Sequence, residues 1–270
     1  MNKHVNLIAY DDFEKLENID KDIKEYRQAK FDSASQHLNF IRRCFPNKKI
    51  TVVELGSGNS KTLFALEKAG ILKLGYGLEI SKSRFKFAEA WKNDWGFRRV
   101  KNINADILEI NFKKLGKFDL CFCADFTFQL LGPVNAQKPA EILNNIYTNL
   151  APNGKIILEL DGFERIISII KNGNIKFWEE FSFPDPWRFS LWDCKYNWQK
   201  KFLAIEKIFI KRNQYGFSKN TTILRVYKRD EICQLLRNAG FKKIKLFSSW
   251  RNKNFKNDGS KYIVMGEKIE

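Results

Sequence analysis

The chain has 270 residues, 44% of them hydrophobic, which is enough for a sizeable buried core. Its formal net charge of +17 is compatible with a nucleic-acid partner, but the lysines are dispersed and no dense Lys/Arg run coincides with a helical pattern. No apolar run has membrane-spanning length, and residues 1–12 do not have the pattern of a signal peptide. The five cysteines form no C-x-x-C pair. We therefore expect a cytoplasmic protein with no membrane partner and no metal site.

The residues before the first predicted strand have a helical pattern. Asp20 or Asp22 can open a long helix, because a carboxylate at a helix start caps free backbone N–H groups, and apolar residues follow at helical spacing to about position 41. His4 and His37, the two histidines of the chain, lie in this region. They can act on a ligand only if these helices fold over the site that binds it.

A short apolar strand followed by a glycine turn is the most informative motif. The strand at 50–53 ends in Glu54, and Gly56 and Gly58 follow at once. Glycine takes backbone angles closed to other residues and lets the main chain approach a ligand. Lys61 stands where a dinucleotide-binding fingerprint requires a small residue, so that class of cofactor is disfavoured. A purely structural turn between strand and helix is the alternative interpretation.

Two further strands are predicted at 73–79 and 100–106, and they end in Glu79 and Asp106. The carboxyl ends of neighbouring parallel strands meet at one edge of a sheet, so these two side chains and Glu54 should converge on one crevice. Glu79 is placed to accept hydrogen bonds from both hydroxyls of a ribose, and Asp106 to lie beside an adenine amino group. The crevice therefore suits a nucleoside that carries positive charge.

Several motifs in chain order resemble those of one enzyme family. They are Glu54-Leu-Gly-Ser-Gly-Asn-Ser60, Glu79 at the end of a strand, Asn104-Ala-Asp-Ile107, Phe118-Asp-Leu-Cys-Phe-Cys-Ala-Asp125, Leu150-Ala-Pro-Asn-Gly-Lys-Ile-Ile-Leu-Glu159 and Arg237-Asn-Ala-Gly-Phe241. In this order and spacing the chain resembles the class I S-adenosylmethionine-dependent methyltransferases over about residues 20–160 and 226–270. Ser60 and Asn153 depart from the family pattern, which often has glycine at both places.

The resemblance implies an α/β fold with a doubly wound, Rossmann-like sheet that is mostly parallel and closed by an antiparallel hairpin. It also implies S-adenosylmethionine as the cofactor. By the same resemblance Tyr10, Tyr26 and Arg27 are candidates to close over its methionine part, although Tyr26 could equally pack its ring on the core. The expected cofactor-binding residues are Glu54, Gly56, Ser57, Gly58, Glu79, Ile80, Asp106, Ile107 and Tyr26.

Residues 161–226 separate the fifth predicted strand from the helix at 230–239 and are rich in aromatic side chains. Alternating patterns predict about four antiparallel strands, which we expect to form an inserted β lid over the crevice. The methyltransferase domain then comprises residues 1–160 and 227–270. Most rings of the insert are expected to exclude water from a thin sheet. The candidates for substrate contact are Trp187, Trp192, Tyr196 and Trp198.

Methyl transfer requires little from side chains beyond orientation, exclusion of water and, where needed, a base. The family places acceptor-facing residues after its fourth strand, so Asp125 is the main catalytic candidate, followed by Thr127 and Gln129; the alternative for Asp125 is that it caps the turn or touches the cofactor. We expect methylation at N or O of a small molecule such as a sugar, an amino sugar or an amine. Methylation of a nucleic acid or a protein is the alternative, although the sequence signatures of nucleobase methyltransferases are absent. A scaffold without catalysis is disfavoured by the intact acidic residues.

Overall fold

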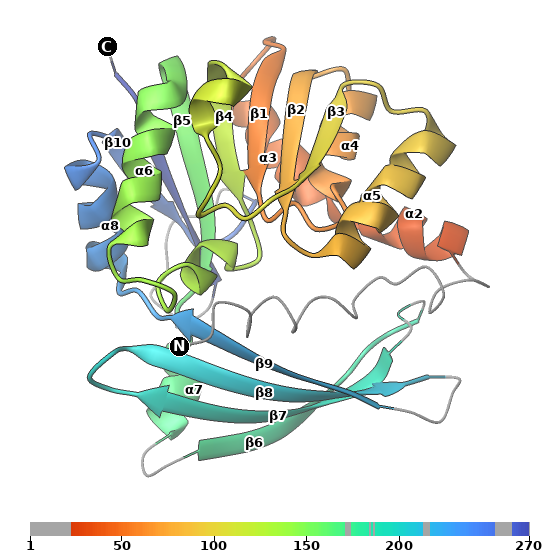
Figure 1. Cartoon of the computed structure of the whole chain (residues 1–270), viewed down its shortest axis with the longest axis vertical. Helices are drawn as coiled ribbons and strands as arrows, with labels where there is room; N and C mark the ends of the chain where they lie inside the picture. Colours follow the sequence, from red (N-terminus) through yellow and green to blue (C-terminus); the bar gives the residue numbers. More distant parts are fainter. Residues whose placement is uncertain are drawn as a thin grey trace.

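The computed structural model describes residues 23–170, 174–183, 185, 187–212, 217–251 and 261–269. Two sheets dominate this part of the chain: a seven-stranded sheet between two layers of helices, and a four-stranded sheet beyond one end of its strands (Figure 1). None of the described helices combines the length and the apolar character that a membrane span requires.

The seven-stranded sheet has the order β10-β11-β5-β4-β1-β2-β3. Its strands are β1 (Ile50–Leu55), β2 (Leu72–Glu79), β3 (Val100–Asn104), β4 (Phe118–Cys123), β5 (Leu150–Asp161), β10 (Lys242–Phe247) and β11 (Lys261–Glu267). All pairs are parallel except those of β11 with β5 and with β10. Strand β1 is buried along its whole length, as expected for a central parallel strand covered on both faces. The predicted fold class is confirmed.

Helices cover both faces of this sheet. On one face lie α2 (Ile23–Ser33), α3 (Ser35–Cys44), α4 (Lys61–Lys68) and α5 (Lys82–Trp95), and on the other lie α6 (Lys138–Asn149) and α8 (Arg229–Asn238). Each layer contributes to its own apolar cluster, with Phe40, Leu63 and Trp91 in the first and Ile142 and Ile232 in the second. Helix α5 starts at Ser81, whose Oγ accepts a hydrogen bond from the backbone N–H of Arg84 at 3.3 Å.

The strand ends differ slightly from the prediction. Glu54 lies inside β1 rather than after it, and β3 ends at Asn104, so that Asp106 belongs to the following turn. Asp106 Oδ1 accepts the backbone N–H of Leu108 at 2.8 Å, and this bond shapes the turn. The three acidic side chains nevertheless lie at one edge of the sheet, because β1, β2 and β3 run parallel.

The insert forms the four-stranded sheet. A short helix α7 (Glu164–Ile169) is followed by the antiparallel strands β6 (Asn174–Glu180), β7 (Trp187–Asn197), β8 (Phe202–Lys211) and β9 (Phe217–Arg225). This sheet, which we call the lid, lies beyond the carboxyl ends of β1, β4 and β5 in Figure 1. The prediction of about four antiparallel strands is confirmed.

The lid rests on the segment that follows β4. Its buried residues Cys194, Leu203, Ile205 and Leu224 form a cluster with Phe163, against which Phe126 and Leu130 also pack. A second attachment is polar, because the Lys30 ammonium of α2 lies 3.6 Å from the carboxylate of Asp185 in the lid. Apolar burial therefore holds the inner face of the lid against the edge of the larger sheet.

Gln129, in the short helix η3 (Thr127–Leu130), joins the lid to the parent sheet. Its side chain is fully buried. The amide nitrogen donates to the backbone oxygens of Asp161 at 3.1 Å and Arg225 at 3.0 Å, and the amide oxygen accepts the N–H of Asp161 at 2.8 Å. One side chain therefore satisfies backbone groups at the end of β5 and at the end of β9.

We predict that Gln129→Leu destabilises the protein by about 2–5 kcal/mol, because apolar Leu removes hydrogen bonds to three partly buried backbone groups. The measurement is urea denaturation followed by circular dichroism. Gln129→Glu is the matched variant, since it keeps an acceptor for Asp161 N–H and loses only the amide donor. Equal stability of wild type and Gln129→Leu would contradict this structural role.

Candidate functional site

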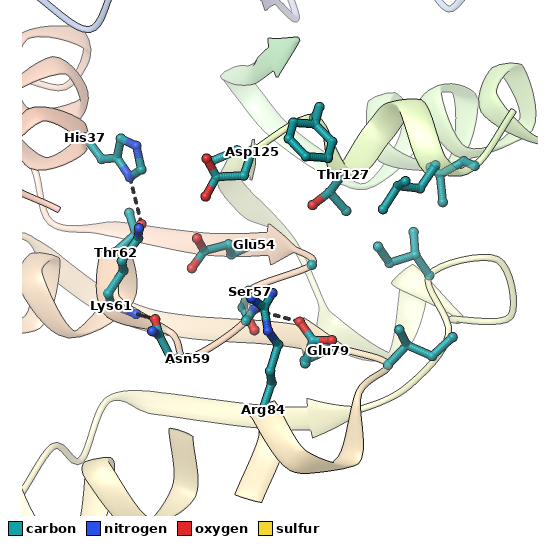
Figure 2. A pocket seen from close by; sticks show the side chains of 18 of the residues that line it. His37, Glu54, Ser57, Asn59, Lys61, Thr62, Glu79, Arg84, Asp125 and Thr127 are labelled. Carbon is teal, nitrogen blue, oxygen red and sulfur yellow. Dashed lines mark hydrogen bonds between the residues drawn. The ribbon is translucent and has the colours of Figure 1, made fainter. Parts of the chain in front are cut away.

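A cavity of about 450 Å³ opens at the carboxyl edge of the large sheet. Residues from the ends of β1, β2 and β4 form its floor, α2 and α3 contribute one wall, and Phe181 of the lid contributes to the opposite side. Figure 2 shows Glu54, Glu79 and Asp125 arranged along the cavity with His37 at one end. All nine predicted cofactor-binding residues line it, including Ser57, Ile80, Asp106, Ile107 and Tyr26.

The turn after β1 needs glycine, because of its backbone angles and because a neighbouring side chain lies close to it. Gly56 and Gly58 have φ values of +64° and +55°, a region that favours glycine. A Cβ atom at Gly56 would lie 2.4 Å from Cγ2 of Thr127, so the turn after β4 approaches the turn after β1 more closely than any side chain permits. The two turns together form a narrow, mostly main-chain part of the cavity wall.

Glu79 is buried and held by main-chain donors. Its Oε2 accepts the N–H of Gly58 at 2.7 Å and its Oε1 accepts the N–H of Ser81 at 2.8 Å. A pair of vicinal hydroxyls fits this arrangement, because the carboxylate is already oriented before a ligand arrives.

Glu54 has a different environment. Burial raises the pKa of its carboxyl to about 8, and the hydrogen bond from the Thr62 side chain and the charge of Lys61 only partly offset this effect. Its Oε2 and the Oγ of Ser57 are buried and have no hydrogen-bond partner among the described residues. A buried acceptor without a partner costs free energy, and a cationic or hydrogen-bonding ligand would satisfy it. Both atoms therefore fit the amino-acid part of S-adenosylmethionine.

The end of the cavity near Asp106 is more apolar. Ile107 and Leu131 are buried there, and Leu108 and Val134 also line it. Ile80 is 39% exposed and lies directly after Glu79. Flat aliphatic walls beside a carboxylate suit a purine ring that carries an amino group.

The turn after β4 directs Asp125 into the cavity. Asp125 and Phe126 both have positive φ values, +50° and +52°, a costly conformation for residues other than glycine. Glu159 holds the turn, since its Oε2 accepts the N–H of Asp125 at 2.8 Å and its Oε1 accepts the indole N–H of Trp250 at 2.9 Å. Strain retained at a cavity wall and fixed by a buried carboxylate is typical of functional positions.

The Asp125 carboxylate is surrounded by positive charge. Burial by itself would raise its pKa, but Lys61 and Lys261 outweigh this and hold the pKa of Asp125 below its ordinary value. The Lys261 ammonium lies 3.6 Å from Asp125 Oδ1. Asp125 is therefore ionised near neutral pH, and its side chain is exposed to the cavity that it lines.

His37 also lines the cavity, on the side of α3. Its ring lies 4.6 Å from that of Trp250, and its Nδ1 hydrogen-bonds Thr62 Oγ1 at 3.0 Å. Burial, with the charge of Lys61 as a second cause, lowers the pKa of His37 to about 4. The imidazole is thus a neutral hydrogen-bonding group. His4 and Tyr10 lie outside the described residues.

Other predicted residues lie away from the cavity. Gln129 was predicted to be catalytic, but it does not line the cavity. Its side chain makes three hydrogen bonds to backbone groups, so its role is structural. Arg27 is buried against Asp94, with which it forms an ion pair at 2.6 Å. Thr127 does line the cavity, beside Asp125.

None of the four predicted tryptophan and tyrosine contacts of the lid lines the cavity. Trp187 is 4% exposed and packs on Phe209, whereas Trp198 is 62% exposed. Tyr196 packs against the apolar cluster of the lid. Trp192 is covered on both sides, by the Phe177 ring at 5.0 Å and by the Lys207 ammonium at 3.4 Å from its ring centroid. These four rings therefore do not form part of the wall of this cavity.

Several lining residues were not singled out from the sequence, namely Lys30, Asn59, Lys61, Thr62, Arg84 and Phe181. Asn59 could have been predicted from the sequence, because it follows Gly58 directly in the glycine turn. In the structure its side-chain oxygen accepts the N–H of Lys61 at 3.2 Å. Arg84 follows the cap of α5 by three positions, which points it back toward the end of β2. Among the described residues, no group of three or more His, Cys, Asp or Glu side chains could hold a metal ion.

Comparisons with known proteins agree with this geometry. A family model described as a methyltransferase domain matches residues 46–176. The carboxy-S-adenosyl-L-methionine synthase of Campylobacter hominis is 27% identical over 209 residues, which are 76% of this chain and 75% of that protein.

Three solved structures share the fold at low identity. An S-adenosylmethionine-dependent methyltransferase from Clostridium acetobutylicum has a TM-score of 0.73 at 16% identity and covers 96% of both chains. The CcbJ methyltransferase from Streptomyces caelestis has a TM-score of 0.74 at 14% identity, covering 88% of this chain and 90% of the other. CalS10 from Micromonospora echinaspora, described as an amino pentose methyltransferase, has a TM-score of 0.63 at 15% identity, covering 89% and 92%. The chain thus contains a methyltransferase domain at residues 46–176, and the motifs and the fold together support a class I S-adenosylmethionine-dependent methyltransferase.

Proposed function

We propose that this enzyme methylates a nitrogen or oxygen atom of a small molecule, such as a sugar, an amino sugar or an amine. The observation that carries the proposal is the position of Phe181, because this residue of the lid lines the same cavity as Asp125 and Glu79. A cavity of about 450 Å³ with a lid residue in its wall suits a small acceptor better than a macromolecule. The described activity of CalS10 on an amino pentose supports the same class of acceptor.

In this proposal, different residues of the cavity bind different parts of the cofactor. The apolar end around Ile107, with Asp106, receives the adenine, and Glu79 accepts hydrogen bonds from the ribose hydroxyls. Glu54 and Ser57 receive the amino-acid part, since their buried oxygen atoms have no partner among the described residues. Tyr26, which is 4% exposed, closes the wall formed by α2.

S-adenosylmethionine supplies a methyl group already activated by the sulfonium, so the protein mainly needs to orient the acceptor and exclude water. Asp125 is ionised and faces the cavity, so it attracts an acceptor that is cationic or that acquires positive charge during attack. It can also accept a proton from the attacking group. Thr127 offers a hydroxyl on the same turn.

Methylation of a nucleic acid or of a protein is the second candidate, favoured by the net charge of +17. A protein that neutralises about six phosphates loses on the order of a thousandfold in affinity between 50 and 200 mM salt. The charge is dispersed along the chain, and the lid narrows access to Asp125. A duplex therefore has little room to present a base there.

The proposed function predicts methyl transfer from labelled S-adenosylmethionine to members of a panel of amino sugars, sugars and amines, but not to bulk RNA, bulk DNA or a denatured protein extract. Filter binding of RNA and DNA at several salt concentrations accompanies the assay. Asp125→Asn is expected to lower the rate on an accepted small molecule by about a hundredfold or more, as loss of a general base does. Methyl incorporation into nucleic acid together with steeply salt-dependent binding would establish the second candidate instead.

Glu79→Ala is expected to weaken the binding of S-adenosylhomocysteine by about 1.5–3 kcal/mol, because it removes a charged acceptor of hydrogen bonds. This corresponds to about a tenfold to hundredfold change in Kd, which calorimetric titration resolves. Glu89→Ala is the matched control, since Glu89 lies on α5 outside the cavity. Equal affinity of Glu79→Ala and wild type would remove Glu79 from the cofactor site.

Cofactor binding is expected to release a proton from Glu54. The free protein has a pKa of about 8 at this carboxyl, so it is mostly protonated at pH 7, and a cationic ligand favours the ionised form. Affinity should therefore rise with pH by up to about tenfold per unit below pH 8 and level off above it. Titrations with S-adenosylhomocysteine in phosphate and in Tris at pH 7 should give different apparent enthalpies. Glu54→Gln should remove this difference, and identical enthalpies for the wild type would refute the assignment.

A further inference from the structure

One lysine lies on the inner face of the lid. In the register of the lid sheet, Phe177 pairs with Trp192, Trp192 with Lys207, and Lys207 with Asn220. Directly paired residues of antiparallel strands point to the same side. The next row on that side includes Cys194 and Ile205, which are buried against the parent domain. Lys207 therefore faces the parent domain and not the outer solvent.

Contacts connect Lys207 with the cavity. Its ammonium lies 6.0 Å from the Phe209 ring centroid, and the Phe209 ring lies 6.0 Å from that of Phe181, which lines the cavity. Lys207 also lies within electrostatic reach of Lys261, whose ammonium is 3.6 Å from Asp125. The lysine therefore lies on the lid side of the cavity, behind Phe209 and Phe181, and is not itself one of the lining residues.

The ammonium of Lys207 lies against an aromatic ring but has no carboxylate partner within 4 Å among the described residues. It lies 3.4 Å from the centroid of the Trp192 ring, and Phe177 supports that ring from its other side. Trp192 is fixed in turn, because its indole N–H donates to Ser190 Oγ at 2.7 Å. Within the described part of the chain, Lys207 forms no hydrogen bond and no ion pair with a carboxylate within 4 Å; Glu179 acts on it only at longer range. Lys261, by comparison, is already paired with Asp125.

A half-buried ammonium in this position has unused donors. A cation over an aromatic face gains about 0.5–2 kcal/mol, but the ring accepts none of the conventional hydrogen bonds that three N–H groups can donate. Burial lowers the pKa of Lys207 to about 8, because the charge of Glu179, which favours the ammonium, only partly offsets it and the charge of Lys261 acts in the same direction as burial. An anion bound there would supply both the charge and the acceptors.

We propose that Lys207 binds an anionic group, a carboxylate or a phosphate, carried by the methyl acceptor. The inference rests on the small-molecule methyltransferase function proposed above and narrows its substrate class. The acceptor then spans two sites of opposite charge, with its anionic group on Lys207 beneath the lid and its nucleophilic atom near Asp125. The predicted substrate-contacting role of Trp192 is thereby replaced by one of support for Lys207.

The test uses the full chain loaded with S-adenosylhomocysteine, titrated with sodium phosphate and separately with sodium acetate at constant ionic strength and pH 7. Tryptophan fluorescence reports binding, because Lys207 lies against Trp192. At least one of the two anions should bind saturably to the wild type. The anion that binds more tightly indicates whether the acceptor carries a phosphate or a carboxylate. Lys207→Met keeps the aliphatic contact with Trp192 and should weaken that binding by about tenfold to a hundredfold. Lys207→Arg should retain most of it.

Lys195→Met is the matched control, since Lys195 is exposed on the opposite face of the neighbouring strand and should change nothing. Lys207→Gln serves as a second neutral variant if Lys207→Met does not fold. A further readout compares methyl transfer to glucosamine 6-phosphate and to glucosamine, and to 4-aminobutanoate and butylamine. The wild type should prefer the member that carries the phosphate or carboxylate in at least one pair, and Lys207→Met should lose that preference.

The outcomes separate this inference from the proposed function. Failure to bind S-adenosylhomocysteine, measured by calorimetry, would contradict the proposed function itself. Binding of S-adenosylhomocysteine without any Lys207-dependent effect of phosphate or acetate overturns only the anion site, as does preference in both pairs for the acceptor that lacks the anionic group.

Discussion

The burial of carboxylates at one edge of a parallel sheet is the constraint on which the site depends. Glu54, Glu79 and Glu159 are each at most 6% exposed. Burial without compensation is costly for a charge, so the partners of each carboxylate determine its state. Glu79 receives two main-chain N–H groups and Glu159 receives one N–H group and an indole. Glu54 has an oxygen with no partner among the described residues, and its pKa is raised to about 8.

Because their hydrogen-bond partners differ, the three buried carboxylates have different roles in the cavity. Main-chain N–H groups orient Glu79, whereas Glu54 keeps one buried oxygen without a partner among the described residues and would gain a counter-charge from a cationic ligand. Glu159 acts on the reaction indirectly, since it fixes the strained turn that directs Asp125 into the cavity. The same turn carries Phe126, against which the lid packs. The position of Asp125 and the seating of the lid are therefore determined by one short segment.

The gathering of the predicted cofactor-binding residues in one cavity was predictable from the sequence, because short-range constraints define it. Gly56 and Gly58 need positive φ, and Glu54 and Glu79 stand at the ends of parallel strands, so local pattern alone brings them together. The lid was predictable only as a set of alternating strands. A period of two separates the faces of a strand but does not say which face is inner or which rings lie beside the cavity. Gln129 illustrates the same limit, because its three partners at Asp161 and Arg225 are distant in sequence.

The distribution of charge between the two sides of the cavity bears on the acceptor. The floor contributes Glu54, Glu79 and Asp106, and Asp125 adds a fourth carboxylate near the lid. On the lid side Phe181 lines the cavity, and Lys207 lies behind it, next to Phe209, held by Trp192 rather than by a carboxylate. An acceptor with a basic nitrogen alone would satisfy Asp125 and leave Lys207 without a counterion. An acceptor with both a nucleophile and an anion satisfies both, and because the two sites lie on different structural units, it also binds the lid to the parent domain during transfer.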